Sequence, residues 1–321
     1  MNIENISEII KKYKYNYKDC SIKVIASNFI NISKQLKFEN IRAFDDFNSV
    51  MNYLNSTELN YQTKANYLKA IKVLLEAIQS ERLILLQYDN QIKDYNTQYR
   101  KVNSDGDFTS KKQEDNFITE KEFNSFMLTF KNEIIKEDLL KKKDLDEFEF
   151  RKLQIYIMLN IFLKFRFRAD IGDMIFINKR ELNKIKKDEQ KEHNYLLFYK
   201  NQFTIILNKY KTDKLGEKSF IVKDRLLSPL LRKYTNITGK GYIFKNNKGE
   251  PFSPNLLSQT IIRFFEKRLN KRFSINLMRK AYLTDKYSDD FKKEVVEDMI
   301  KDSYIMGHSI ETAQTIYKKT L

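Results

Sequence analysis

The sequence predicts a mainly α-helical protein with a small antiparallel β-sheet, divided into two domains. The chain has 321 residues, of which 41% are hydrophobic, so it can bury a substantial core and is long enough to favour two domains. Apolar residues recur at helical spacing over most of residues 1–95. Segments with strand-like patterning are few, and they lie close together in the second half.

Residues 1–95 are expected to form a small helical bundle. Helices are predicted near residues 5–14, 22–36 and 43–55. A further segment, "YQTKANYLKAIKVLLEAI", has an apolar stripe made of Leu68, Ile71, Leu75 and Ile78. Its other faces carry Lys64, Lys69 and Lys72. This is the pattern of an amphipathic basic helix.

A polar stretch separates the two predicted domains. The segment "NTQYRKVNSDGDFTSKKQED", residues 96–115, has few apolar residues, and its Ser-Asp-Gly-Asp run is typical of a turn. We therefore predict a helical domain over 1–95, a linker over 96–117 and a second domain over 118–321.

The second domain is predicted to begin with two helices and a small sheet. Thr119 and Glu122 have the spacing of a capping box, and "DEFEFRKLQIYIMLNIFLKF" is apolar on nearly every side, as in a central core helix. The segments "YLLFYK" and "FTIILNKY", separated by Asn201-Gln202, predict a hairpin, with "KSFIV" as a third strand.

The last part of the chain is again helical in pattern. Ser253-Pro254 suits the N-cap and first position of a helix that runs to about Asn270. Further helices are predicted over about 275–286, 291–303 and 309–317.

Charge and composition restrict the function. Lys and Arg number 59 against 43 Asp and Glu, a formal net charge of +16 that favours a polyanion such as nucleic acid, although AT-rich coding would also raise the lysine count. With one cysteine, Cys20, and two histidines, neither a disulfide nor a common zinc site is expected, and no phosphate-binding glycine loop occurs. We expect no metal and no cofactor. The absence of a long apolar run or signal sequence predicts an intracellular protein without a membrane span.

One of the two histidines lies in the C-terminal segment "MGHSIETAQTIY". His308 follows Gly307 and lies nine residues before Tyr317. On one continuous helix these two side chains would point to opposite faces, about 13 Å apart along the axis. A turn at Gly307 with Ser309 as N-cap would instead allow both to face one pocket.

Three further basic clusters precede this segment. In "SINLMRKAYL", Asn276 and Arg279 share a helical face, with Lys280 adjacent. In "FRFRADIGDM", two arginines follow an apolar helix, where charge is unusual unless an anion is bound. A third cluster places Lys211 at a turn between strands, with Lys209 and Lys214 as competitors.

In this order, the clusters resemble the tyrosine recombinase (phage integrase) family. "MGHSIETAQTIY" has the family's glycine-histidine turn and its tyrosine nine residues later, and "NLMR" occupies the place of its H-x-x-R motif. Lys211 resembles the lysine of its β-hairpin, and "FRADIGDM" resembles its first arginine box. The resemblance covers about residues 118–321, and "YQTKANYLKAIKVLLEA" resembles the helical DNA-clamping domain that precedes it in the family.

The resemblance implies double-stranded DNA as partner and strand cleavage without metal or ATP. Tyr317 would attack a backbone phosphate and form a 3′-phosphotyrosine. Arg168 and Arg279 would hold the phosphate oxygens, His308 would add a hydrogen bond, and Lys211 would protonate the leaving 5′ oxygen. DNA contacts would come from Lys64, Lys69, Lys72 and Lys280. The resemblance also allows a homodimer or homotetramer on DNA.

The sequence departs from the family pattern in three places. Asn276 stands where the family has histidine, and asparagine cannot accept a proton. Arg168 precedes Asp170 by two residues instead of three, which keeps Arg166 as an alternative first arginine. Only four residues follow Tyr317, too few for an added C-terminal helix.

Two other functions remain open at this level. A type IB topoisomerase-like enzyme would use the same chemistry to relax DNA, but "TAQTI" before Tyr317 lacks that family's S-K-x-x-Y motif. A non-catalytic DNA-binding descendant is suggested by Asn276, and it would bind DNA in a salt-sensitive way without a covalent product.

Overall fold

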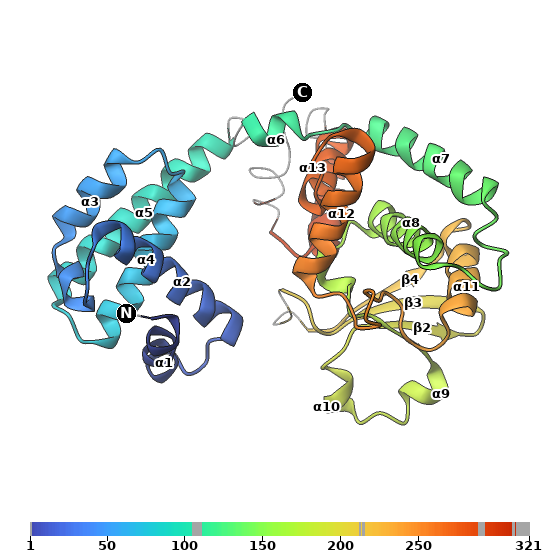
Figure 1. The fold of residues 1–321 in the computed structure, drawn as a ribbon, viewed down its shortest axis with the longest axis horizontal. Coiled ribbons are helices and arrows are strands. Elements are labelled where there is room, and N and C mark those ends of the chain that lie inside the picture. The colour runs from blue at the N-terminus through green and yellow to red at the C-terminus, as the bar shows by residue number, and fades with distance from the viewer. Residues whose placement is uncertain are drawn as a thin grey trace. The chain divides into compact units, whose positions relative to one another are not determined.

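The computed structural model describes residues 2–104, 111–211, 213, 216–287, 293–309 and 312, without the side chains of 103–104 and 293–297. Contacts divide the chain into two compact units, Met1–Asp105 and Gly106–Leu321 (Figure 1). Each unit has its own hydrophobic core.

The first unit is a helical bundle, as the sequence predicts. Its elements are α1 (Ile3–Tyr13), α2 (Asp19–Leu36), η1 (Ile41–Asp45), α3 (Phe47–Ser56), α4 (Tyr61–Ala77) and α5 (Arg82–Ser104). Short polar side chains cap four of these starts by accepting from a backbone amide three residues on: Asn2, Asn40, Asp46 and Asn60. The buried Tyr88 hydroxyl donates to the Phe44 carbonyl at 2.7 Å and so joins α5 to η1.

The division between the two units, Asp105 to Gly106, falls within the linker predicted over 96–117, and helical residues occupy part of that stretch on either side. α5 continues to Ser104, because Tyr95 is buried in the core and Lys69 on α4 donates to Asn96. After the undescribed residues, α6 (Lys111–Asp115) and the residues that follow it belong to the second unit. There Asn116 accepts from the Arg272 amide, and the Phe117 carbonyl accepts from Lys271 at 2.6 Å.

The second unit mixes helices with one sheet. Its helices after α6 are α7 (Glu120–Lys136), α8 (Glu147–Phe165), η2 (Ala169–Ile171), α9 (Lys179–Leu182), α10 (Lys187–Gln190), α11 (Leu227–Thr238), α12 (Pro254–Leu269), α13 (Ile275–Lys286) and α14 (Lys293–Met306). Its strands are β1 (Ile175–Asn178), β2 (Tyr195–Tyr199), β3 (Gln202–Leu207), β4 (Lys218–Val222) and β5 (Gly241–Tyr242).

The sheet corrects the prediction of an all-antiparallel arrangement. Its order is β4-β3-β2-β1-β5, and β1 pairs with β2 in parallel, with Ile175 opposite Tyr195. The segment with α9 and α10 carries the chain back to the end of the sheet where β1 begins, so that β2 can run parallel to β1. The hairpin turn is Lys200-Asn201, both at positive φ (47° and 61°), so Gln202 already begins β3.

α8 lies at the centre of the core, as its sequence predicts. Most of its second half is buried, including Ile157, Leu159 and Ile161, which are 0% exposed. The capping box of Thr119 and Glu122 forms at the start of α7, and a second one forms at Asp146 and Glu149 before α8.

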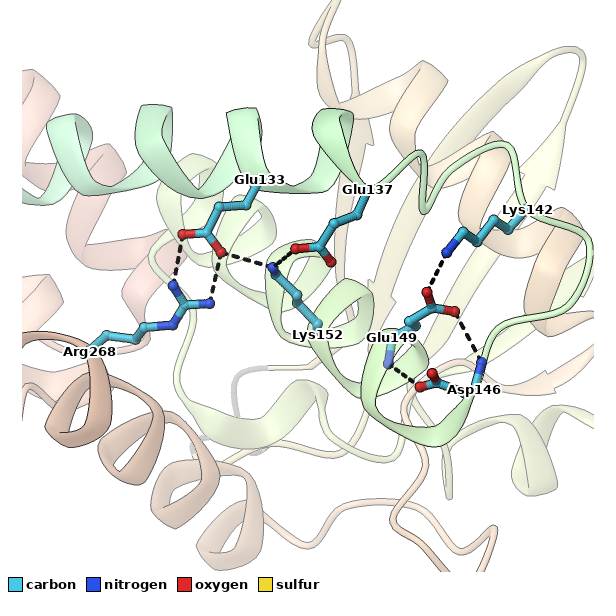
Figure 2. Close-up of polar contacts among 7 residues, drawn as sticks. All are labelled: Glu133, Glu137, Lys142, Asp146, Glu149, Lys152 and Arg268. Atoms are coloured by element: carbon cyan, nitrogen blue, oxygen red, sulfur yellow. Dashed lines mark hydrogen bonds and ion pairs between the residues drawn. The ribbon is translucent and has the colours of Figure 1, made fainter.

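Ion pairs hold α7 against α8 and α12 (Figure 2). Glu133 accepts two hydrogen bonds from Arg268, at 2.7 and 2.8 Å, and lies 2.9 Å from Lys152. These contacts hold the pKa of the Glu133 carboxyl at about 2, with the Arg268 hydrogen bonds as the main cause. Figure 2 also shows Lys152 paired with Glu137, and Lys142 paired with Glu149.

One glycine fixes the position of η2. The Phe252 amide donates to the Gly172 carbonyl at 3.2 Å, and a Cβ atom on Gly172 would lie 2.4 Å from the Phe252 carbonyl oxygen. Only glycine allows this approach. The turn before α12 therefore packs directly on the segment that carries Arg168 and Asp170.

Candidate active site

The two arginines after α8 have different environments. Arg166 ends the helix in a left-handed conformation, with φ of 53°. Its guanidinium is buried, pairs with Glu120 and lies 4.5 Å from the Tyr282 ring centroid. Arg168 is half-buried, and its Nη1 is buried without a hydrogen-bond partner among the described residues. Arg166 also has one buried nitrogen, Nε, without a hydrogen-bond partner among the described residues, so the two arginines differ in their surroundings: Arg166 is paired with Glu120, whereas Arg168 lines a cavity.

Arg168 lines a small cavity where four segments meet. The cavity measures about 10 Å³, which leaves room for roughly one water molecule. Its walls come from η2 and the residues before it, from β3 and the loop after it, from the start of β4, and from the end of α14. The lining residues are Phe167, Arg168, Asp170, Leu207, Tyr210, Lys218, Ile305, Met306 and Gly307.

Two buried cations donate to the last turn of α14. Arg279, 1% exposed, donates from Nη2 to the Met306 carbonyl at 2.8 Å. Lys218, also 1% exposed, donates from Nζ to the Tyr304 carbonyl and lies 4.2 Å from the Tyr304 ring centroid. Carbonyls at a helix C-terminus lack intrahelical partners and carry partial negative charge, which explains why both cations bind there.

His308 follows this turn in the geometry that the sequence predicts. Gly307 has φ of 68°, and the His308 amide donates to the Ser303 carbonyl at 3.1 Å, which closes the helix. The ring Nδ1 lies 3.0 Å from the Ser309 carbonyl and therefore carries the proton, while Nε2 lies 3.3 Å from the Met306 sulfur.

Burial, together with the surrounding positive charge, keeps the His308 ring neutral. Burial lowers its pKa to about 4, and Arg279, Arg168 and Lys218 act in the same direction. Burial together with Arg168 also lowers the pKa of Lys218. Four segments distant in sequence thus bring four basic side chains to one place, and such a place attracts an anion.

Asp170 and Asn194 connect this centre to the loop after β3. Asp170 Oδ2 accepts from the Lys211 amide at 3.4 Å, and burial raises the pKa of its carboxyl. Asn194 is 0% exposed and donates to the carbonyls of Asp170 and Lys209, both at 2.8 Å. It also accepts from the amides of Asn208 and Lys209, both at 2.9 Å.

Several predicted residues do not join the cavity in this structure. The Lys211 and Asn276 side chains are exposed, and neither lines the cavity. Lys280 is 5% exposed, and its Nζ donates to Gln113 on α6 at 2.6 Å. Tyr317 and the helix expected over 309–317 lie outside the described residues, apart from Ser309 and Thr312, and so does Lys214.

The lysines of α4 also differ in their surroundings. Lys64 is 8% exposed, and Lys72 pairs with Asp89 at 2.6 Å and Glu76 at 3.2 Å. Lys69 is the exposed member of the three. The prediction that all three contact DNA therefore rests most directly on Lys69.

The residue that sequence analysis missed is Lys218. The sequence pattern of the strand could have identified it, because successive side chains of a strand point to opposite faces of the sheet. Lys218 shares its face with the partly buried Phe220 and the buried Val222, while Ser219 and Ile221 are exposed. A lysine on the inward face of a strand requires an acceptor or an anion.

The described residues contain neither a metal-site cluster nor a membrane-spanning helix. Within them, no cluster of three or more histidine, cysteine or acidic side chains has the geometry of a metal site. None of the described helices combines the length and apolar character needed to cross a membrane.

Among solved structures, the chain is similar to the Tn1549 transposon integrase, determined in complex with transposon right end DNA. The match covers 100% of this chain and 96% of that one, with a TM-score of 0.58 and 15% sequence identity. The fold is that of a tyrosine recombinase. XerA recombinase matches with a TM-score of 0.40 and 12% identity, over 100% of this chain and 95% of that one. No protein-family model and no curated protein matches the sequence.

The tyrosine recombinase fold confirms the predicted architecture, with a helical first unit and a mixed α and β second unit. The sequence features that resemble this family are the glycine-histidine turn and the two arginine motifs. Arg168, Arg279 and His308 are the predicted residues that the structure brings together.

Proposed function

We propose that this protein is a site-specific DNA recombinase or integrase that cleaves and rejoins DNA through a phosphotyrosine intermediate. The observation that supports it best is the convergence of four basic side chains: Arg168 and Lys218 line one cavity, and both act with Arg279 on the neighbouring His308 ring. The fold is shared with an integrase that was solved bound to DNA. The net charge of +16 suits the same partner.

In the proposed reaction, the Tyr317 hydroxyl gives its proton to water as its oxygen attacks a backbone phosphorus, and the bond from phosphorus to the 5′ oxygen breaks. Negative charge grows on the non-bridging oxygens in the transition state. The free Nη1 of Arg168 would donate to one of them, and Arg279 would donate to another. Loss of one such donor costs about 3–4 kcal/mol in related acyl-transfer sites, or at least a hundredfold in rate.

His308 would change its protonation state when the phosphate binds. Without an anion, burial and the neighbouring cations hold its pKa at about 4. A bound phosphate offsets the charge of Arg168 and Arg279, and this raises the pKa of the ring toward the ordinary value for histidine. Nε2, now facing the Met306 sulfur, would then donate to a phosphate oxygen.

The leaving 5′ oxygen needs a proton, and we assign its donation to Lys218. The amine of Lys218 already lines the cavity beside Arg168, whereas the Lys211 side chain is exposed on the loop. Burial and Arg168 lower the pKa of Lys218, which makes its ammonium a better acid. Lys211 would contact the DNA backbone next to the cleaved bond.

DNA binding would have to widen the cavity. A phosphodiester is larger than the single water that about 10 Å³ can hold. The last turn of α14 forms one wall of the cavity, and its carbonyls accept hydrogen bonds from Lys218 and Arg279. A shift of this turn would release both cations toward the phosphate.

The experiment is covalent capture on DNA. The purified protein is incubated with nicked duplexes carrying its recombination site, and an SDS-resistant adduct is expected. Tyr317→Phe should abolish the adduct and retain DNA binding, and Arg168→Lys should reduce it at least a hundredfold. Binding without any adduct on its own site would refute the enzyme and leave the non-catalytic DNA-binding protein.

A sulfur substrate separates the two lysines. A 5′-bridging phosphorothiolate leaves as a thiolate and needs no proton, so it should restore cleavage by Lys218→Met to near the wild-type rate. Lys211→Met should show a smaller loss, equal on both substrates. If the sulfur substrate rescues Lys211→Met and does not rescue Lys218→Met, the proton donor is Lys211 and not Lys218.

A further inference from the structure

A buried charge cluster lies beside the candidate active site, and the proposed chemistry does not use it. It consists of Glu120, Arg166, Tyr282, Lys286 and Asp302, with the Tyr287 hydroxyl as an additional donor. These residues come from the start of α7, the end of α8, α13 and α14.

Asp302 is the acceptor at the centre of this cluster. A single oxygen, Oδ2, accepts from the Tyr287 hydroxyl at 2.6 Å, the Tyr282 hydroxyl at 3.0 Å and Lys286 Nζ at 2.9 Å. The Asp302 side chain is only 13% exposed, so these are hydrogen bonds to a largely desolvated carboxylate. They hold α14 on α13 in one register.

The cluster continues from Tyr282 to the end of α8. The ring of Tyr282 lies under the guanidinium of Arg166, 4.5 Å from centroid to Cζ, and Arg166 pairs with Glu120. Arg166 and Glu120 expose only 7% and 8% of their side chains. Breaking one partner of such a buried pair leaves an uncompensated charge, so this arrangement is held firmly.

Each contact is close in sequence to a basic residue of the candidate active site. Arg166 precedes Arg168 by two residues, Tyr282 follows Arg279 by one helical turn, and Asp302 precedes His308 by six residues. The cluster therefore lies where the three segments that carry these groups cross. Arg279 adds a direct tie between two of them through the Met306 carbonyl.

We infer that Asp302 is a positioning residue for the active site: it fixes α14 on α13 and thereby sets where His308 lies relative to Arg168 and Arg279. The inference rests on the proposed function for its effect on cleavage. Its effect on His308 is independent of that function.

The test compares Asp302→Asn with a matched control. The amide has nearly the same shape, but its neutral oxygen accepts hydrogen bonds more weakly than the charged carboxylate oxygen that the three donors share. Tyr282→Phe with Tyr287→Phe removes two donors and keeps the rings, and it replaces Asp302→Asn if that variant does not fold. The control is Phe130→Leu, since Phe130 is buried between α7, α8 and α12 and contacts Tyr156 and Phe264, away from the cluster.

Two readouts are measured on the full chain at a temperature well below each variant's melting point. The first is the ring titration of His308 by NMR, which is assignable because His193 is the only other histidine and His193→Gln removes its signal. The second is the single-turnover rate of adduct formation beside the Kd for DNA.

Asp302→Asn should move the pKa of His308 from about 4 toward 6.5, because a loosened α14 exposes the ring to water. The adduct rate should fall at least tenfold, while the Kd for DNA changes less than twofold. Phe130→Leu should leave both readouts unchanged.

An unchanged His308 titration in Asp302→Asn would overturn the inference. Equal shifts in Phe130→Leu would also overturn it, because they would reflect general loss of stability. If the wild type forms no adduct but its His308 still responds to Asp302→Asn, the proposed enzyme fails and the positioning role stands.

Discussion

Replacement of Asn194 by alanine should destabilise the second unit strongly. Asn194 is 0% exposed, and its side chain serves four backbone groups: the Asp170 and Lys209 carbonyls and the Asn208 and Lys209 amides. A buried group left without a partner costs about 1–3 kcal/mol. Water can enter part of the space left by the side chain, so we expect a loss of about 3–5 kcal/mol in the free energy of unfolding.

The measurement is urea denaturation followed by circular dichroism. A loss of that size is a large share of the stability of an ordinary domain, which is about 5–15 kcal/mol. The matched control is Asn208→Ala, which removes two hydrogen bonds, to the Gln190 and His193 carbonyls at 2.9 and 3.0 Å, from a half-buried position. It should lose only about 1 kcal/mol.

The reasoning fails if Asn194→Ala loses less than about 1 kcal/mol, or no more than Asn208→Ala. Either result would mean that the four backbone groups find other partners. The loop that carries Lys211 would then be held to η2 by the Asp170 carboxylate alone.

Two further predictions concern the same site. Gly172→Ala should lower the melting temperature by several degrees, because its Cβ would lie 2.4 Å from the Phe252 carbonyl oxygen; an unchanged melting temperature would show that the turn before α12 shifts freely. His308 should make stability depend on pH. Its folded pKa of about 4 lies below the unfolded value of about 6.5, so the unfolded chain binds more protons between these values. Stability should therefore fall by up to about 1.4 kcal/mol per pH unit as the pH drops from 6.5 to 4. His308→Gln should remove this part of the slope, and His193→Gln should retain it.

Most helices and the β-hairpin follow from the sequence. The capping box at Thr119 and Glu122, the N-cap at Ser253 and the turn at Gly307 form as predicted. These features depend on contacts between residues a few positions apart, so the local spacing of residue types is enough to predict them. β1 and β5 were missed because they are four and two residues long and gain their pairing from the sheet.

The tertiary structure decided which basic residues share the site. From sequence, Arg166 and Arg168 were alternatives, and the structure separates them through the left-handed end of α8, which turns Arg166 toward Glu120. Arg279 is buried, but Asn276 on the same helix is exposed, although three residues are only about 60° apart around a helix, so the edge of the buried face of α13 runs between them.

By itself, then, the sequence determined the helices, the order of the motifs and the resemblance to tyrosine recombinases, since these depend on local spacing. Only the tertiary structure placed Lys218 in the cavity and Lys211 outside it. The convergence of Arg168, Lys218, Arg279 and His308 depends on how the sheet and α14 pack around α8 and α13, and no local pattern encodes that packing.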